Sequence, residues 1–347
     1  MKRRPLLLLG GTAVVAAAAA IVLGPRGPGT PPESSSAPLM FQNLAGRLTG
    51  AARIEVRQGG KSVAVAKRDA ESWVLPDMQD YPVRPEKVRE LLVGLTELRL
   101  TERRTNDAAM LDRLGLEDPA AANGSAALLR VLDGKGDPIA ELVVGRRRMR
   151  TQGGVPESVY VRRPAETQAW LAEGRLPLDA DPQLWIDRDL ANIARERVLK
   201  VEATRLGEPP LVLTRGEGPD GVLTVTTPAQ TPPLEEGNVD EVGRAFEFLT
   251  LTEVRKEAAA PGQPLGETRF TLTDNLTITA SGHQDGETIW IRLAAAGDDE
   301  AARLNARWRG WAYRVAEWKA KALLPRLQDM QKAEAPAPAA TPAAPAR

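Results

Sequence analysis

The chain contains a single histidine, His283, in the stretch SGHQDGE, so any imidazole chemistry depends on this one side chain. Asp285 and Glu287 follow it closely, and hydrolytic or metal sites place carboxylates beside histidine. There is no cysteine, which excludes thiol nucleophiles, thiolate zinc sites and disulfides. The sequence also offers no second imidazole and no nucleophile-elbow motif. We therefore predict that His283 lies in a surface turn and that the chain has no catalytic residue.

Four aspartates in the stretch LDADPQLWIDRDL could supply oxygen ligands to a calcium ion: Asp179, Asp181, Asp187 and Asp189. The stretch lacks the Asp-x-Asp-x-Asp-Gly spacing and the closing glutamate of an EF-hand loop. Aspartates also accept backbone N–H groups at caps and turns. We expect such capping roles, with no metal ligand and no cofactor site.

The most unusual charge cluster is formed by Arg146, Arg147, Arg148 and Arg150. Its position between two predicted strands indicates a loop. A solvated hairpin tip is the plainer interpretation; the alternative is contact with an anionic headgroup, glycan or partner surface. The chain as a whole is balanced, with 46 Lys and Arg against 46 Asp and Glu, and gives no reason to expect nucleic acid as a partner.

Four tryptophans crowd the C-terminal half: Trp290, Trp308, Trp311 and Trp318. Their spacing on predicted strand and helix faces favours core packing over a ligand platform. The only Gly-Gly pair near an apolar run, Gly10-Gly11, falls inside the N-terminal apolar segment, so no phosphate-cradling loop is predicted.

The N-terminus predicts the location of the protein. Lys2, Arg3 and Arg4 precede an uncharged run, LLLLGGTAVVAAAAAIVL at 6–23, which is at the lower length limit for a membrane-spanning helix. We favour an uncleaved anchor over residues 1–24, with a cleaved signal peptide as the alternative. Either arrangement keeps the basic residues in the cytoplasm and exports the body. The prediction is a single-pass protein of a bacterial inner membrane with its body in the periplasm.

Composition divides the rest of the chain. Residues 25–50 begin with a stretch rich in Pro, Gly and Ser and predict a stalk, whereas 331–347 is an Ala- and Pro-rich tail that predicts disorder. The folded body between them is expected to hold two modules, 51–180 and 181–330, that meet near residues 178–198.

A repeated phrase indicates that the modules are related: LRLTERR occupies 98–104 and LTLTEVR occupies 249–255. Each phrase follows a helical stripe of apolar residues, predicted at 86–98 and 238–249. Three pairs across the stripes differ by a constant 151 positions: Val88 and Val239, Leu95 and Phe246, Leu98 and Leu249.

Further alternating segments flank both stripes. A hairpin-like pair precedes each one, and two strands and a turn follow at 127–145 and again at 276–294. A third strand, SVYVRR or WAYRVA, then leads into a predicted helix that carries Trp170 or Trp318. The predicted fold class is therefore α+β, a tandem duplication of a β-β-α-β-β-β-α module with mainly antiparallel sheets, preceded by one transmembrane helix.

A family resemblance rests on the order of several motifs along the chain. They are Trp73, YPVRPEKVRELLVGLTEL, RLGLEDP at 113–119, LVVG at 142–145, VYVRR, and LWIDRDLANIARERVLKVEA at 184–203. With this order the chain resembles the bacterial envelope family called domain of unknown function 4340, over roughly residues 50–325. Leu114 departs from the family pattern, in which an aromatic residue commonly precedes the Gly-Leu.

The resemblance implies one N-terminal membrane anchor and a gene that often lies beside those of ABC-type permeases, and it offers no catalytic residue to carry over. Our first hypothesis is a non-enzymatic, membrane-anchored periplasmic accessory or scaffold of an ABC-type envelope transport complex. The alternative is a binding module for an envelope glycan or lipid, through the arginine cluster or a groove between the modules. A hydrolase is a remote third.

Overall fold

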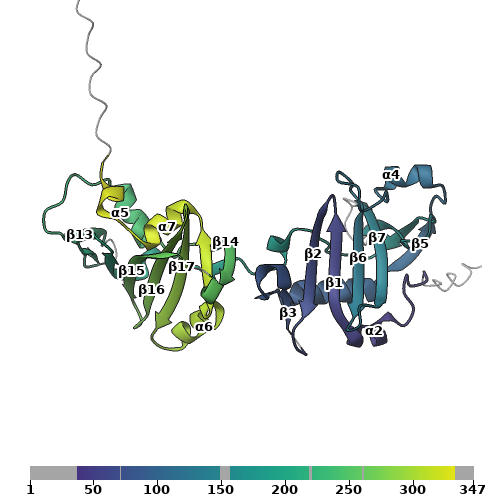
Figure 1. Ribbon diagram of the computed structural model, residues 1–347, viewed down its shortest axis with the longest axis horizontal. Coiled ribbons are helices and arrows are strands. Elements are labelled where there is room, and N and C mark those ends of the chain that lie inside the picture. Colours follow the sequence, from purple (N-terminus) through teal and green to yellow (C-terminus); the bar gives the residue numbers. More distant parts are fainter. Residues whose placement is uncertain (1–36, 71, 149–156, 219–220, 260–261, 333–347) are drawn as a thin grey trace, which may run out of the picture.

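The computed structural model describes residues 37–70, 72–148, 157–218, 221–259 and 262–332. The predicted anchor, the first part of the predicted stalk, Arg150 and the tail after Lys332 lie outside the described residues. Among the residues described, no helix is both long and apolar enough to cross a membrane. The fold mixes helices and strands and contains two large antiparallel sheets, one from each half of the chain (Figure 1).

The first sheet has nine strands in the order β4-β3-β2-β1-β6-β7-β8-β9-β5, and every neighbouring pair is antiparallel. Its strands are β1 (Ala51–Gln58), β2 (Lys61–Lys67), β3 (Trp73–Leu75), β4 (Tyr81–Pro82), β5 (Arg99–Arg103), β6 (Ala127–Asp133), β7 (Pro138–Arg148), β8 (Ser158–Arg162) and β9 (Trp170–Glu173). Its helices are α2 (Leu44–Arg47), α3 (Pro85–Glu97) and α4 (Leu111–Leu114).

Helix α3 packs against the core side of this sheet because its apolar residues form one stripe. Pro85 begins the helix, where its missing N–H costs nothing, and Leu91 and Leu95 are fully buried. Gly94 lets the helix approach the chain beyond β9 closely, since a Cβ there would collide with the carbonyl of Arg175. The predicted helix at 86–98 is confirmed within one residue at each end.

The second sheet also has nine strands, in the order β10-β14-β18-β17-β16-β15-β11-β12-β13, and its neighbouring pairs are antiparallel. Its strands are β10 (Asp189–Ala191), β11 (Val198–Arg205), β12 (Leu211–Arg215), β13 (Leu223–Thr227), β14 (Leu249–Lys256), β15 (Gln263–Leu272), β16 (Thr277–Asp285), β17 (Thr288–Ala296) and β18 (Trp311–Val315). Its helices are α5 (Glu236–Gly243), α6 (Asp299–Trp308) and α7 (Glu317–Leu323). Short 3-10 helices occupy Leu48–Gly50, Pro76–Met78, Ala108–Met110, Pro182–Leu184, Arg195–Arg197, Glu257–Ala259 and Leu327–Met330.

The helix predicted at 238–249 is shorter than expected. Helix α5 ends at Gly243, and the chain then passes through Phe248, whose φ of 48° is incompatible with a continuing right-handed helix. Phe246 nevertheless reaches the core as predicted: it is fully buried, and its ring meets that of Phe270 edge-on with 4.8 Å between centroids.

The two sheets share one strand order. When β4 is left out of the first sheet and β10 out of the second, three strands precede the long helix of each module and five follow it. The strands of both sheets are then ordered third, second, first, fifth, sixth, seventh, eighth, fourth. In this correspondence β1 matches β11, β5 matches β14, and β9 matches β18.

The predicted module order is wrong in its second part. Trp170 lies in β9 and not in a helix, and the strand β15 was not predicted at all. Because β15 was missed, the strand pair at 127–145 was matched to 276–294, whereas the sheet order matches β6 to β15 and β7 to β16.

Part of the predicted stalk is also wrong, because residues 37–50 belong to the first module. Met40, Phe41 and Leu44 are buried in its core. Leu39 pairs with Arg99 at the edge of β5, as Asp189 of β10 pairs with Thr250 at the edge of β14. The same edge of each sheet is therefore occupied by the segment that opens the module: an isolated β-bridge at Leu39 in the first sheet and the short strand β10 in the second.

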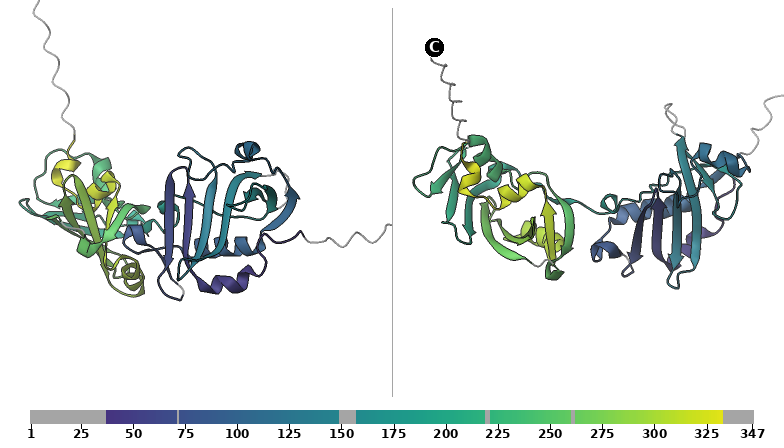
Figure 2. Two further views of the ribbon diagram at one scale, coloured as in Figure 1. Left: turned by 45° about the vertical axis from the view of Figure 1, so that its right-hand side comes forward. Right: turned by 45° about the horizontal axis from the view of Figure 1, so that its top comes forward.

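The modules meet between β9, the last strand of the first sheet, and β10, the opening strand of the second. Tyr81 of β4 packs edge-on against Trp311 of β18, with 4.8 Å between ring centroids, and its hydroxyl lies beside that of Tyr313. Burial raises the pKa of Tyr81 to about 12, so the phenol stays neutral. Figure 2 shows the two sheets side by side, with this junction between them.

Polar contacts reinforce the junction. The Arg84 guanidinium donates to the Leu184 carbonyl at 2.8 Å, and the Arg84 backbone N–H donates to the Trp185 carbonyl at 2.8 Å. Gln183 donates from its side chain to the Thr252 carbonyl at 3.0 Å. One cluster of buried apolar residues includes side chains of both modules. The modules therefore pack against each other and are not joined by the linker alone.

Candidate functional site

The structure separates the arginines of the predicted loop. Strand β7 continues to Arg148, and a register shift between Val144 and Arg147 redirects the side chains. Arg146 lies against Gly115 of the α4 turn, whereas Arg147 donates to the carbonyl of Leu176 at 2.5 Å. The prediction of a common loop tip is therefore wrong for these residues, and Arg150 lies outside the described residues.

The aspartates of the linker behave as caps and turns, as predicted. The Asp179, Asp181 and Asp187 carboxylates accept the backbone N–H groups of Asp181, Gln183 and Asp189, at 2.9, 2.9 and 3.0 Å. Asp187 also forms an ion pair with Arg307 at 3.3 Å. Within the described part of the chain, no three acidic or histidine side chains are placed to hold a metal ion.

The prediction of a turn around His283 is wrong, because β16 extends to Asp285 and the tight turn follows at Gly286. His283 pairs across the sheet with Trp290 of β17 and Pro264 of β15. Its imidazole is half-buried, and its Nδ1 is buried with no hydrogen-bond partner among the described residues. Burial and then Arg292 lower the pKa of His283, and Glu257 opposes them, so the ring is neutral near pH 7.

The tryptophans of the second module differ in burial. Trp290 and Trp308 are buried as predicted, and Trp311 forms the junction. Trp318 is 56% exposed, so the core prediction is wrong for it. Trp290 lies beneath the Arg255 guanidinium, 3.5 Å from the ring centroid, and Asp285 holds that guanidinium at 3.3 Å.

A surface hollow of about 500 Å³ opens beside His283, which we call the α6 hollow. The hollow forms because β17 and β18 pair only at Ile291 and Tyr313. Beyond this pair the two strands separate, and α6 lies beside β17 in place of a paired strand. The Asn305 side chain then takes the place of a neighbouring strand: it accepts the Ala295 N–H at 2.9 Å and donates to the Ala295 carbonyl at 2.7 Å.

The lining of the α6 hollow is mainly polar. Thr279, Ser281 and His283 project from the same side of β16. Arg292 of β17 lies opposite and pairs with Glu257 at 3.4 Å, and Arg309 closes the rim after α6.

A second hollow adjoins it along α6. It measures about 620 Å³ and shares Ala295, Asn305 and Arg309 with the first. The rest of its lining consists of Ala296, Gly297, Ala301, Ala302 and Ala306, so small side chains leave this space open.

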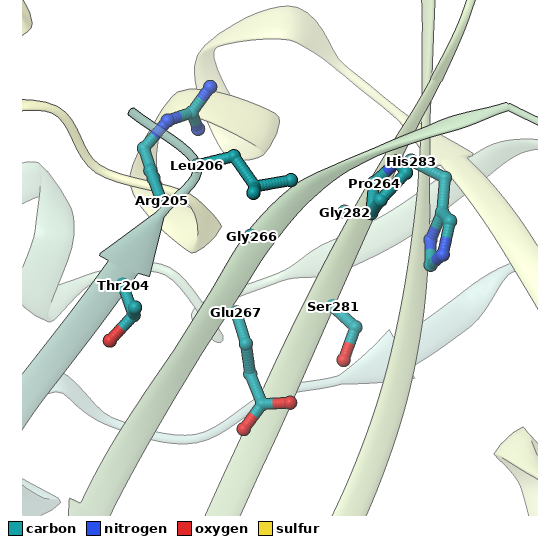
Figure 3. Close-up of a pocket in the computed structure, with 9 residues that line it drawn as sticks. All are labelled: Thr204, Arg205, Leu206, Pro264, Gly266, Glu267, Ser281, Gly282 and His283. Carbon is teal, nitrogen blue, oxygen red and sulfur yellow. The ribbon is translucent and has the colours of Figure 1, made fainter. Parts of the chain in front are cut away.

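A further hollow, of about 420 Å³, lies on the other side of Ser281 (Figure 3). Gly282 belongs to its lining, and a Cβ at this position would collide with Leu324. In Figure 3 Glu267 and Ser281 project side by side, and His283 lies farther to the right, apart from both. No hydrogen bond joins the three side chains in the described structure, so serine, histidine and glutamate are near one another without forming a relay.

Comparison with known proteins gives a family but no function. The profile of a family described as Domain of unknown function (DUF4340) matches residues 73–264, more than half of the chain. The chain belongs to this family. No curated protein and no solved structure matches it. The residues of the α6 hollow, from Glu257 onward, lie almost entirely beyond the DUF4340 match.

The motif RLGLEDP, one of the six on which the resemblance rests, lies within the DUF4340 match and has a structural role here. Gly115 adopts a φ of 67° and closes α4, and Glu117 Oε1 accepts hydrogen bonds from the Ser125 and Ala126 backbone. Burial acts to raise the pKa of Glu117, but these hydrogen bonds outweigh it and lower the pKa overall. Oε2 has no partner among the described residues.

The Arg162 side chain supplies hydrogen-bond donors to this loop. It is buried and donates to the carbonyls of Leu116 and Pro164, each at 2.9 Å, and of Glu117 at 3.3 Å. The family motif therefore holds a buried loop whose carbonyls would otherwise lack donors.

Of the residues that line the α6 hollow, His283, Trp308 and Trp311 were singled out from the sequence, and the others were missed. Helix α6 has a largely polar sequence, DEAARLNARW, whose two buried residues, Ala301 and Trp308, do not form a continuous apolar stripe. The capping pair Asp298–Asp299 and the alanines were the available signals.

Proposed function

We propose that the two halves are copies of one module and that the protein is a membrane-anchored, non-enzymatic scaffold or accessory of an envelope transport complex. The duplication is supported by the identical strand order and by the constant offset of 151 positions between buried residues of the two helical stripes. The opening edge segments, at Leu39 and Asp189, add a third agreement.

The scaffold role is supported by one observation above all, the burial of Tyr81 between the modules. Its ring contacts Trp311 and its hydroxyl meets Tyr313, so the modules hold a fixed spacing. A protein that positions partners needs such a spacing, whereas a tether between independent modules does not.

The anchor, the periplasmic location and the link to a transporter come from the sequence. The apolar run at 6–23 with its basic flank supports the anchor in a bacterial inner membrane. The association with ABC-type permeases rests on the family resemblance, which is an analogy.

The test is purification of the full-length chain from native membranes in mild detergent through a C-terminal affinity tag, followed by mass spectrometry. We expect enrichment of ABC-type permease subunits with the parent chain and with Tyr81→Phe, which keeps the ring. Tyr81→Ala should remain in the membrane but lose most of that enrichment, because the module spacing is released.

Two results would count against the proposal. If the parent chain enriches no permease subunit, the transport role is wrong. If Tyr81→Ala retains partners as well as the parent does, the fixed spacing has no part in the function.

A further inference from the structure

The α6 hollow and the alanine-lined hollow beside it are two adjoining compartments with different side chains. The first is lined by hydroxyls, an imidazole and guanidinium groups, and the second by five alanines and Gly297 together with Asn305 and Arg309. Arg309 lines both, so a charged group stands where the compartments meet. Their volumes, about 500 and 620 Å³, are within the range of small-molecule sites.

The polar compartment has an excess of positive charge. Glu257 is engaged by Arg292, both through the 3.4 Å ion pair and through a hydrogen bond from Arg292 to its backbone carbonyl at 3.3 Å. Arg309 forms no ion pair with any described residue. Two guanidinium groups against one carboxylate leave one unbalanced positive charge in the compartment, at its rim.

Neutral hydrogen-bond donors also line the α6 hollow. The Thr279 and Ser281 hydroxyls project from β16 beside His283, whose Nδ1 lacks a partner in the described structure. An oxyanion bound at Arg309 would accept hydrogen bonds from such hydroxyls, and charge-assisted bonds of this kind are the stronger ones in proteins.

The alanine side chains of the second compartment offer apolar contact, beside the polar groups of Asn305 and Arg309. Ala295, Ala296, Ala302 and Ala306 leave a shallow trough along α6 whose methyl groups present no hydrogen-bonding atom. Burial of a hydrocarbon chain there is worth about 0.8 kcal/mol per CH₂ group that is fully removed from water.

We propose that this pair of hollows binds a singly charged amphiphile, with an oxyanion head at Arg309 and Ser281 and an acyl chain along the alanines. A free fatty acid and an anionic phospholipid share this chemistry. The inference does not depend on the transport role, because it concerns binding by the purified chain.

The single histidine provides a direct reporter. The charged groups that face His283 are Arg292 on β17, Glu257 after β14 and Arg309 beyond α6. A bound anion favours the imidazolium, so occupancy should move the imidazole resonance and raise the pKa of His283. NMR of the full-length chain labelled only at histidine, and purified without a histidine tag, yields one signal to follow.

The measurement uses the chain in phosphatidylcholine nanodiscs with four added probes. Octanoate carries head and chain, acetate the head alone, octanol the chain alone, and inorganic phosphate tests a free oxyanion. A parallel sample replaces part of the phosphatidylcholine with phosphatidylglycerol, which separates a bilayer source from a free one. We expect saturable movement of the His283 signal with octanoate or with phosphatidylglycerol, and little with acetate, octanol or phosphate.

Variants locate the site. Arg309→Gln should weaken octanoate binding about tenfold, which corresponds to ~1.4 kcal/mol, while the thermal transition is unchanged. Arg303→Gln removes an equally exposed arginine of α6 that lines neither hollow and should bind within about twofold of the parent. Ala306→Phe should fill the trough and abolish octanoate binding.

The proposal is overturned if neither octanoate nor phosphatidylglycerol moves the His283 signal. It is equally overturned if acetate, phosphate or octanol does so as strongly as octanoate. Equal loss of binding in Arg309→Gln and Arg303→Gln would place the anion elsewhere on α6 and would also contradict the assignment.

Discussion

The two sheets share a strand order but differ in the connections that cover them. In the first module the long connection is 104–126, between β5 and β6, and it contains α4 and the family motif. In the second module the corresponding connection is only 257–262, and the elaborated one is instead 297–310, which contains α6.

The polar groups beside these two connections also differ. Beneath the first connection, Arg162 donates to backbone carbonyls and so serves the fold. Beside the second, His283 lines an open hollow, and its Nδ1 is buried without a partner in the described structure. The comparison teaches that a strand frame can be kept while one connection is tied down by a buried guanidinium and another leaves a surface hollow with polar side chains in its lining.

The shared frame should be the most sensitive part of both modules. Leu95→Ala should reduce the free energy of unfolding by ~2–5 kcal/mol and Phe246→Ala by ~3–5 kcal/mol, since both side chains are fully buried. The measurement is denaturant unfolding, with amide hydrogen exchange to report each sheet separately. Val93→Ala and Phe248→Ala, which truncate exposed neighbours, are the controls. A parent-like melt for Phe246→Ala would remove the structural basis of the correspondence.

The stability of the first connection should depend strongly on Arg162. Arg162→Met leaves the carbonyls of Leu116 and Pro164 without a donor and should cost about 2–3 kcal/mol. The same change at the exposed Arg113 should stay within about 0.5 kcal/mol of the parent. Chemical denaturation compares the two variants directly. Similar, small losses in both would show that the loop does not need its buried guanidinium.

The junction should respond more moderately. Tyr81→Phe loses only the hydroxyl that lies beside Tyr313 and should cost about 0.5–1.5 kcal/mol, with the modules still melting together. Tyr81→Ala also loses the ring contact with Trp311, and calorimetry should then resolve two transitions. One unchanged transition in Tyr81→Ala would mean that the remaining polar contacts suffice to couple the modules.

The smallest effect concerns pH and His283. Its folded-state pKa is lowered by burial and by Arg292, so the unfolded chain binds this proton more readily than the folded chain. Stability should therefore fall as pH drops below the unfolded-state pKa near ~6.5 and continue to fall until the folded-state pKa is reached. His283→Gln should lose less stability than the parent between about pH 7.5 and about pH 5.5. Parallel losses in the two proteins would contradict the direction of the shift.

The sequence predicted those parts of the fold in which periodicity is strong. The stripe of α3 and the hairpins with alternating apolar residues carry clear signals, and so does the 151-residue offset. Strand β15 was missed because Gly266 and the polar stretch ETR interrupt its alternation. Trp170 was assigned to a helix because a four-residue strand is too short to show a period.

The candidate site was less accessible from the sequence. Strand β17 separates from β18 where Asn305 takes over the hydrogen bonds of the Ala295 backbone. This is a tertiary contact that no local sequence pattern encodes. The arginine cluster is a case in which a clear local pattern led to a wrong prediction. The arginines are adjacent in sequence, but a register shift between Val144 and Arg147 directs their side chains to different places. The packing of Met40 and Phe41 was hidden by the Pro- and Ser-rich stretch immediately before them.

The separate strand membership of the two sheets has a kinetic consequence. Neither sheet borrows a strand from the other half, so every hydrogen bond of the first sheet joins residues that leave the ribosome before β10 does. The opening segment at Leu39 finds its partner only once Arg99 has been made, and the sheet is complete at Glu173. The second half then folds against a surface on which Tyr81 is already fixed, which makes the junction the final step of assembly.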